Sequence, residues 1–154
     1  MTPGEPRTPR SPDDLPDGTL SMDGFARWTL PALAPGSEQV TYVRHQTRLV
    51  LRLWRLTDLT DAVEVLISEI ATNAVRHART LFTVAAIWDG RALRVEVSDA
   101  SLVTPQPQLA VHSDREGGRG LLMVDAIATD WGVDVHPDGK TVWFVISRDP
   151  TMPW

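Results

Sequence analysis

Two polar side chains with helical spacing could act together on a bound ion or a water molecule. Glu69 and Asn73 are four residues apart, so on a helix they lie one above the other on one face. A carboxylate and an amide oxygen placed this way could hold a hydrated Mg²⁺, which keeps several waters and takes few protein ligands. Arg76 and His77 extend this face by another turn, and a cationic His77 would suit a helix C-terminus. A solvated helix face has the same composition.

Two later features could contribute to the same chemistry. Asp99 ends an apolar run, where its carboxylate could accept a hydrogen bond from the exocyclic amine of adenine or form an Asx turn. A glycine-rich loop, GGRGL at residues 117–121, opens a predicted helix. Unpaired N–H groups at a helix N-terminus bind anions, and Arg119 could add a bidentate contact. The alternative is an ordinary turn. The chain contains no GxxxxGKS or GxxxxGKT sequence, so the loop is not a P-loop.

Two helices are predicted before these features. The first covers residues 37–56, where apolar residues recur at helical spacing and four arginines line another face: Arg44, Arg48, Arg52 and Arg55. This face is either solvated or a docking stripe for a partner. The second covers residues 60–78, with Thr60 or Asp61 as its cap. Glu64 follows Asp61 by three residues, as in a capping box.

The remaining pattern predicts strands. A short strand at residues 25–30 ends at Pro31, and a hairpin joins residues 81–88 to 92–99 through Asp89-Gly90. After a polar loop at 101–116 and a short helix at 121–129, a second hairpin joins 132–136 to 141–147 through the turn 137–140. Helices grouped against such strands predict an α+β, two-layer sandwich whose mixed, mostly antiparallel sheet carries its helices on one face.

Composition limits the class of protein. The length of 154 residues fits one domain, which we place at residues 23–148. Residues 1–22 are rich in proline and poor in large apolar side chains, which predicts a disordered or loosely docked tail. Residues 149–154 are expected to be a loose end. The absence of cysteine excludes disulfides, thiolate metal sites and cysteine nucleophiles. Lys140 is the single lysine, which we interpret as a feature of composition.

Charge and hydropathy bear on location. A net charge of −5 opposes nonspecific binding to DNA or anionic lipid. No apolar run approaches the roughly 20 residues of a membrane span, and the N-terminus lacks the apolar region of a signal peptide. We therefore expect a cytoplasmic protein.

Three motifs in fixed order resemble those of the histidine-kinase-like ATPase superfamily, which includes Hsp90, type II topoisomerases and sensor kinases. Residues 68–78 (SEIATNAVRHA) are similar to its N box, 95–99 (VEVSD) to its adenine box and 118–121 (GRGL) to its phosphate box. The resemblance covers about residues 23–148. Within the superfamily the chain looks most like small, stand-alone anti-sigma factor serine kinases.

The resemblance implies a role for each matching residue. Asn73 would coordinate Mg²⁺, Glu69 would orient or deprotonate the attacking nucleophile, and His77 would lie near the phosphates. Asp99 would accept a hydrogen bond from the adenine amine, and Thr141 would support the adenine pocket. The phosphates would lie against the turn formed by Gly118, Arg119, Gly120 and Leu121.

The resulting expectation is a regulatory protein that binds ATP and Mg²⁺. As a serine/threonine-protein kinase it would phosphorylate an antagonist protein, and it could also sequester a sigma factor. Its partner would be a protein rather than nucleic acid or membrane. A homodimer is one possible state, since anti-sigma relatives are commonly dimers, but the sequence does not determine the oligomeric state.

Two other functions remain compatible with the sequence. A non-catalytic protein-binding module is favoured by the absence of glycine in the three residues after Asp99 and by the short loop at 101–116, which contains Pro105 and Pro107. Glu69 and Asn73 argue against this alternative. A domain that binds another small ligand in the same cleft is the third possibility.

Overall fold

An antiparallel sheet forms one layer of the protein. The computed structural model describes residues 20–22, 25–102 and 123–148. Within them the sheet has six strands in the order β1-β2-β3-β4-β6-β5, and each neighbouring pair is antiparallel. The strands are β1 (Leu20–Met22), β2 (Phe25–Thr29), β3 (Phe82–Trp88), β4 (Ala92–Asp99), β5 (Asp130–His136) and β6 (Gly139–Ser147).

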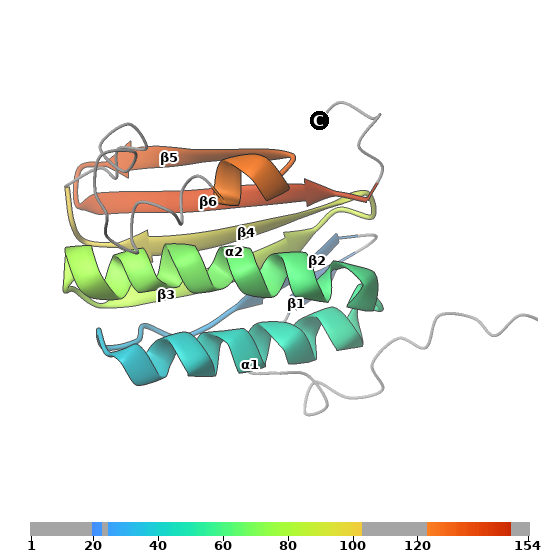
Figure 1. Cartoon of the computed structure of the whole chain (residues 1–154), viewed down its shortest axis with the longest axis horizontal. Helices are drawn as coiled ribbons and strands as arrows, with labels where there is room; N and C mark the ends of the chain where they lie inside the picture. Colours follow the sequence, from blue (N-terminus) through green and yellow to red (C-terminus); the bar gives the residue numbers. More distant parts are fainter. Residues whose placement is uncertain (1–19, 23–24, 103–122, 149–154) are drawn as a thin grey trace, which may run out of the picture.

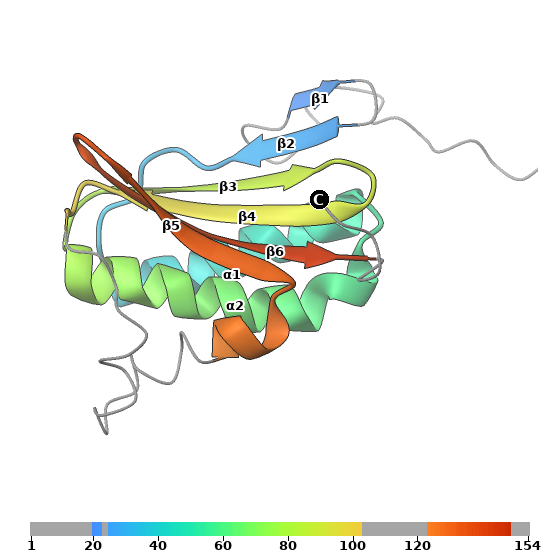
Figure 2. The same ribbon diagram turned by 90° about the horizontal axis from the view of Figure 1, so that it is seen from above.

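The helices form the second layer, on one face of the sheet. Helix α1 (Ser37–Leu53) lies beside α2 (Thr60–Asn73) (Figure 1). The rotated view in Figure 2 shows both helices below the strands. A short 3₁₀ helix, η2 (Thr57–Leu59), leads into α2. Between the layers lies an apolar core whose largest side chains are Trp28, Phe82 and Phe144. The predicted two-layer α+β fold is confirmed, whereas the sheet, predicted as mixed, is antiparallel throughout the described strands.

Helix α1 ends three residues before its predicted end at residue 56, because the chain turns left-handed. Arg55 has φ 58°. The amide of Leu56 donates to the carbonyl of Leu51 at 2.8 Å, and that of Arg55 to Arg52 at 3.2 Å. This pair of bonds is a Schellman motif, which normally places glycine where Arg55 stands. Leu56 is fully buried behind it.

The predicted capping box at the start of α2 is wrong. The helix begins at Thr60 after Leu59, and no side chain caps it. Glu64 instead accepts a hydrogen bond from Nε of Arg48 on α1. The arginine lowers the pKa of the Glu64 carboxyl, mainly through that hydrogen bond. A contact between two helices therefore replaces the local cap.

Both predicted hairpins are present. In the first, Asp89 Oδ1 accepts from the amides of Arg91 and Ala92, both at 2.8 Å, and Gly90 takes φ 91°. In the second, the strands extend further than predicted, since β5 begins at Asp130 and β6 at Gly139. Lys140 and Thr141 therefore both lie within a strand, where successive side chains point to opposite faces.

The chain ends fall mostly outside the described residues. Residues 20–22, which the sequence analysis assigned to the N-terminal tail, form β1 because their backbone pairs with β2. The rest of that tail, most of the loop at 101–116, the glycine-rich turn at 117–121 and the end at 149–154 lie outside the described part. Of the predicted helix at 121–129, residues 123–127 are helical. No helix among the described residues is long and apolar enough to cross a membrane.

Candidate functional site

The elements that carry the predicted site residues come together at one end of the molecule. There α2 finishes, β4 ends at Asp99 and β6 begins, as the left side of Figure 1 shows. Phe82, the first residue of β3, lies opposite Asp99 in the ladder. Thr80 Oγ1 accepts from the amide of Ala100 at 3.0 Å. This bond ties the chain just after α2 to the chain just after β4.

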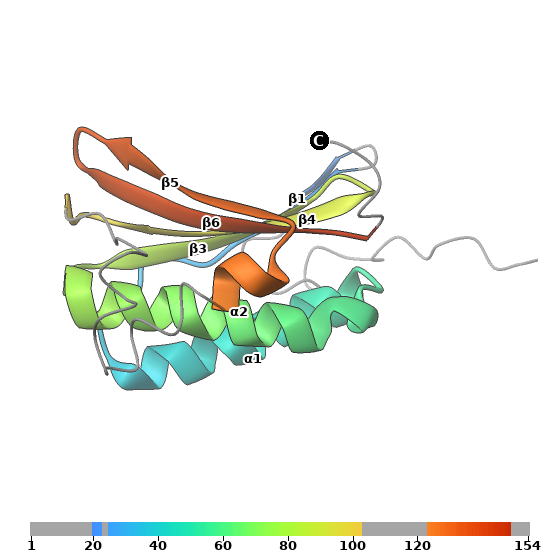
Figure 3. The same cartoon turned by 45° about the horizontal axis from the view of Figure 1, so that its top comes forward.

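Glu69 and Asn73 lie on the flank of α2 that faces away from α1. Glu64 marks the flank that faces α1, because Arg48 binds it. With 3.6 residues per turn, Glu69 and Asn73 fall roughly opposite Glu64 around the helix. Both side chains are half-buried. The short helix at 123–127 lies on this side of α2 in Figures 1 and 3.

The helix widens directly after Asn73. Residues Ala74–Ala78 form a π-helical turn, η3, closed by the amide of Arg79 donating to the carbonyl of Ala74 at 3.3 Å. Arg79, which follows this turn, adopts the left-handed conformation with φ 53°. Single π turns occur frequently at functional sites. The α-helical spacing that predicted Arg76 and His77 on the face of Asn73 therefore stops at Asn73, and both side chains are exposed.

The carboxylate of Asp99 forms a buried ion pair with Lys140. Lys140 Nζ donates to Asp99 Oδ1 at 2.9 Å, and the two side chains are 6% and 2% exposed. The two residues are direct partners in the β4–β6 ladder. The amide of Ser101 also donates to Oδ1, at 2.8 Å. Both side chains lie on the same face of the sheet as the core residues Val97 and Val142, which is the face that the helices cover.

Gly139 allows β6 to approach Asp99 this closely. A Cβ atom on Gly139 would lie 2.0 Å from the backbone oxygen of Asp99 and 2.9 Å from Cα of Ala100. Any side chain there would push the start of β6 away from the end of β4. The glycine thus sets the register that brings Lys140 to Asp99.

Thr141 does not join this group. Because side chains alternate along a strand, Thr141 lies on the face opposite Lys140 and Asp99. Its Oγ1 is 2.8 Å from Ser98 Oγ and 3.0 Å from His136 Nε2. The place beside Asp99 that Thr141 was expected to support is held by Lys140. The sequence analysis chose Thr141 from the family resemblance and left Lys140 out of the site, because the pairing of Asp99 with Lys140 depends on the register of β4 and β6.

The oxygen atoms of Glu69 and Asn73 suit a cation that is bound mainly by a nucleotide and water, rather than one enclosed by protein ligands. Among the described residues, no group of three or more His, Asp or Glu side chains could hold a metal ion. Asn73, with Glu69 one turn away, offers hard oxygen atoms of the kind that Mg²⁺ binds together with waters and phosphates. The predicted phosphate-binding residues Gly118, Arg119, Gly120 and Leu121 lie outside the described residues.

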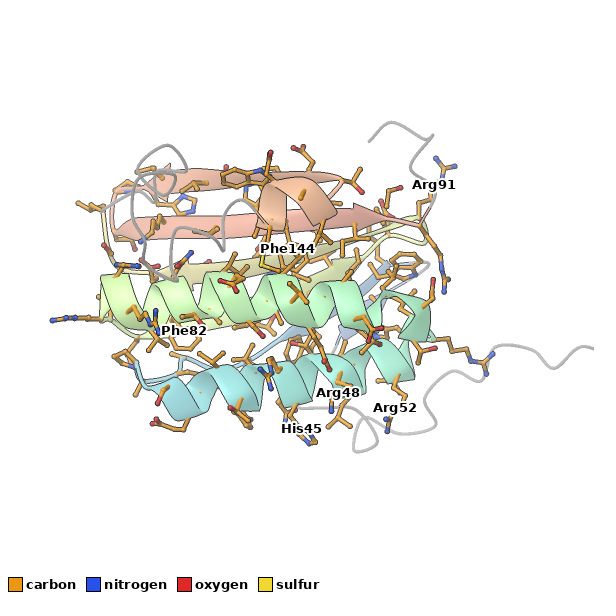
Figure 4. The ribbon with its side chains drawn as sticks, viewed as in Figure 1. His45, Arg48, Arg52, Phe82, Arg91 and Phe144 are labelled. Atoms are coloured by element: carbon orange, nitrogen blue, oxygen red, sulfur yellow. The ribbon has the colours of Figure 1, made fainter. Side chains whose placement is uncertain are left out.

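The arginine face of α1 is divided. Figure 4 shows His45, Arg48 and Arg52 in sequence order along α1. Arg48 is paired with Glu64, whereas Arg44 and Arg52 are exposed. Arg55 lies past the end of the helix, and its carbonyl accepts from Arg148 at 3.2 Å. The face is therefore partly used in joining elements of the fold.

Comparison with known families agrees with this arrangement. Residues 33–146 match the histidine kinase-like ATPase domain, which covers most of the chain, and the chain belongs to this family. The matched region contains both helices, the hairpins and all the predicted site residues. No curated protein matches the chain at a significant level.

Proposed function

We propose that this protein is an ATP-binding regulator that resembles the anti-sigma factor serine/threonine kinases. It phosphorylates an antagonist protein, sequesters a sigma factor, or does both. The observation that carries the proposal is that α2, which bears Glu69 and Asn73, leads into the chain tied to the end of β4, where the buried carboxylate of Asp99 lies. Membership in the ATPase family supports a nucleotide as the ligand of this edge.

Each group has one task in the proposed reaction. Asp99 accepts a hydrogen bond from the adenine amine and fixes the base at the buried end. Asn73 would hold Mg²⁺ together with the phosphates, and the bound ion would neutralise part of their charge. Glu69 takes the proton of the partner's serine hydroxyl, while the serine oxygen bonds to the γ-phosphorus and the bond to the ADP oxygen breaks. Phosphoryl transfer requires mainly such positioning and charge neutralisation.

A phosphorylation assay tests the base role. The protein is incubated with ATP, Mg²⁺ and a purified candidate antagonist, and phosphoserine is measured. Glu69→Gln should reduce the rate by about 10² to 10⁴, as expected for loss of a general base. Glu64→Gln is a matched control because it changes the same residue type on the flank of α2 that faces α1. An equal rate for Glu69→Gln and wild type would contradict the base role.

A second candidate function is a binding module without catalysis. Two observations favour it: no glycine follows Asp99 in residues 100–102, and Asp99 Oδ1 is already engaged by Lys140 and Ser101. In this alternative the domain acts through protein contacts alone. A wild-type protein that binds its partner equally well with and without ATP, and transfers no phosphate, would identify it.

A further inference from the structure

Lys140 is a buried cation to which the proposed reaction gives no task. Its side chain is 6% exposed and lies on the helix-covered face beside Asp99. An ammonium group carries three N–H donors. Among the described residues, Nζ of Lys140 donates one hydrogen bond, to Asp99. The group therefore has donors left over in a place where unfilled donors are costly.

Stability does not explain why two charges are kept here. A buried ion pair is often no more stable than two apolar side chains of similar volume. Apolar pairs occupy the preceding positions of the same face, where Val97 is opposite Val142. On this principle, an apolar pair in place of Asp99 and Lys140 is expected to be about as stable. The charged pair therefore points to a ligand.

The pair offers a ligand one acceptor and one donor side by side. Within the described part of the chain, the Asp99 side chain accepts two hydrogen bonds, and both end on Oδ1, from Lys140 Nζ and from the amide of Ser101. Oδ2 remains to accept from a ligand, and Lys140 Nζ remains to donate. A planar ring with an amine beside a ring nitrogen matches this pattern, and adenine carries that combination at N6 and N1.

We infer that Lys140 is a specificity-determining residue that reads the base together with Asp99. The adenine amine donates to Asp99 Oδ2, and adenine N1 accepts from Lys140 Nζ. Guanine presents the reverse pattern at these atoms, with an acceptor at O6 and a donor at N1. Lys140 therefore makes the site prefer adenine through a ring atom as well as through the amine. This inference rests on the proposed function, because it requires a nucleotide at Asp99.

A pair of nucleotides that differ at one atom tests the inference. In 1-deaza-ATP the ring nitrogen N1 is replaced by C–H, whereas the amine is kept. Titration calorimetry with Mg²⁺ should show wild type binding ATP about tenfold or more tightly than 1-deaza-ATP, as expected for one hydrogen bond to a charged group. Lys140→Met should bind both nucleotides equally. Ser98→Ala, on the other face of the sheet, should keep the wild-type ratio.

The outcomes separate this inference from the function on which it rests. Wild type that binds ATP and 1-deaza-ATP equally would overturn the role of Lys140 and leave ATP binding intact. GTP bound at least as tightly as ATP would overturn the preference for adenine. Wild type that binds no ATP would overturn the proposed function and this inference with it. If Lys140→Met does not fold, the comparison of the two nucleotides on wild type still decides.

Discussion

An ion pair between an aspartate and a basic side chain lies at each end of β6, and one pair is buried whereas the other is exposed. At its start Lys140 meets Asp99, with side chains 6% and 2% exposed. Just past its end Arg148 meets Asp58, with side chains 44% and 51% exposed. Nε of Arg148 donates to Asp58 Oδ2 at 3.0 Å, and the guanidinium lies 5.8 Å from the ring centroid of Trp88.

The comparison separates an exposed pair that joins two elements of the fold from a buried pair that we propose belongs to the nucleotide site. Exposed pairs contribute little because water and salt screen them. Arg148 joins the end of the sheet to η2, where a weak contact is sufficient. A buried pair requires both charges to leave water, so each depends strongly on its partner. The end with Asp99 is the end where the predicted site residues meet.

The largest expected difference is in the stability lost when the cationic side chain of each ion pair is replaced. Lys140→Met leaves the carboxylate of Asp99 buried without its counter-charge, which should lower the free energy of unfolding by about 3–5 kcal/mol. Arg148→Met should lower it by less than about 1 kcal/mol. Urea denaturation of both variants measures the two values. Similar losses for the two variants would break the comparison.

Replacing the whole buried pair should separate stability from binding. The double variant Asp99→Leu/Lys140→Met should regain most or all of the stability that Lys140→Met loses, because apolar side chains then fill the same space. It should nevertheless bind no ATP, since the acceptor for the adenine amine is gone. Denaturation and calorimetry on one preparation test both results. A double variant that binds ATP like wild type would show that adenine binds elsewhere.

The close approach behind the buried pair should also be sensitive to substitution. Gly139→Ala would place Cβ 2.0 Å from the backbone oxygen of Asp99, so β6 must shift. We expect a loss of about 1–3 kcal/mol, as for overpacking in a core, together with weaker ATP binding. Gly90→Ala, in the exposed turn at the other end, is a control that should retain ATP binding. Unchanged stability of Gly139→Ala would show that β6 can move freely.

The smallest expected effect is on the stability of the fold at acidic pH. Arg148 donates a hydrogen bond to Asp58 and so lowers the pKa of that carboxyl in the folded protein. A carboxyl with a lowered pKa stabilises the fold above its unfolded value of about 3.9, and this contribution is lost as the pH falls through the folded value. Between pH 7 and pH 5, Asp58→Asn should therefore cost a constant amount below about 1 kcal/mol. The difference between wild type and variant should shrink below pH 4. A difference that grows there would contradict the assignment.

The parts of the fold that depend on neighbouring residues could be predicted from the sequence. Asp89-Gly90 determines its hairpin through two bonds from Asp89 to the next amides. The capping box failed because Arg48, 16 positions before Glu64, competes for that carboxylate. A motif within α2 contains no information about the partner that α1 presents.

The site could be predicted only in part, for the same reason. Glu69, Asn73 and Asp99 each end or lie on an element that the sequence identifies, so their approach follows from the fold. Lys140 and Asp99 are separated by 41 positions and meet through the register of two strands. A shift of one residue in that register exchanges Lys140 for Thr141. The family resemblance, from which Thr141 was assigned to the site, carries no information about this register.

One measurement tests the central claim, that a nucleotide binds at the end with Asp99. The thermal unfolding midpoint is recorded with and without millimolar ATP and Mg²⁺ for wild type, Asp99→Asn and the matched variant Asp58→Asn. Ligand at about 100 times its Kd should add roughly 2.7 kcal/mol, which is a rise of several degrees for a domain of this size. We predict this rise for wild type and Asp58→Asn and none for Asp99→Asn. No rise for wild type, or an equal rise for all three proteins, would contradict the claim.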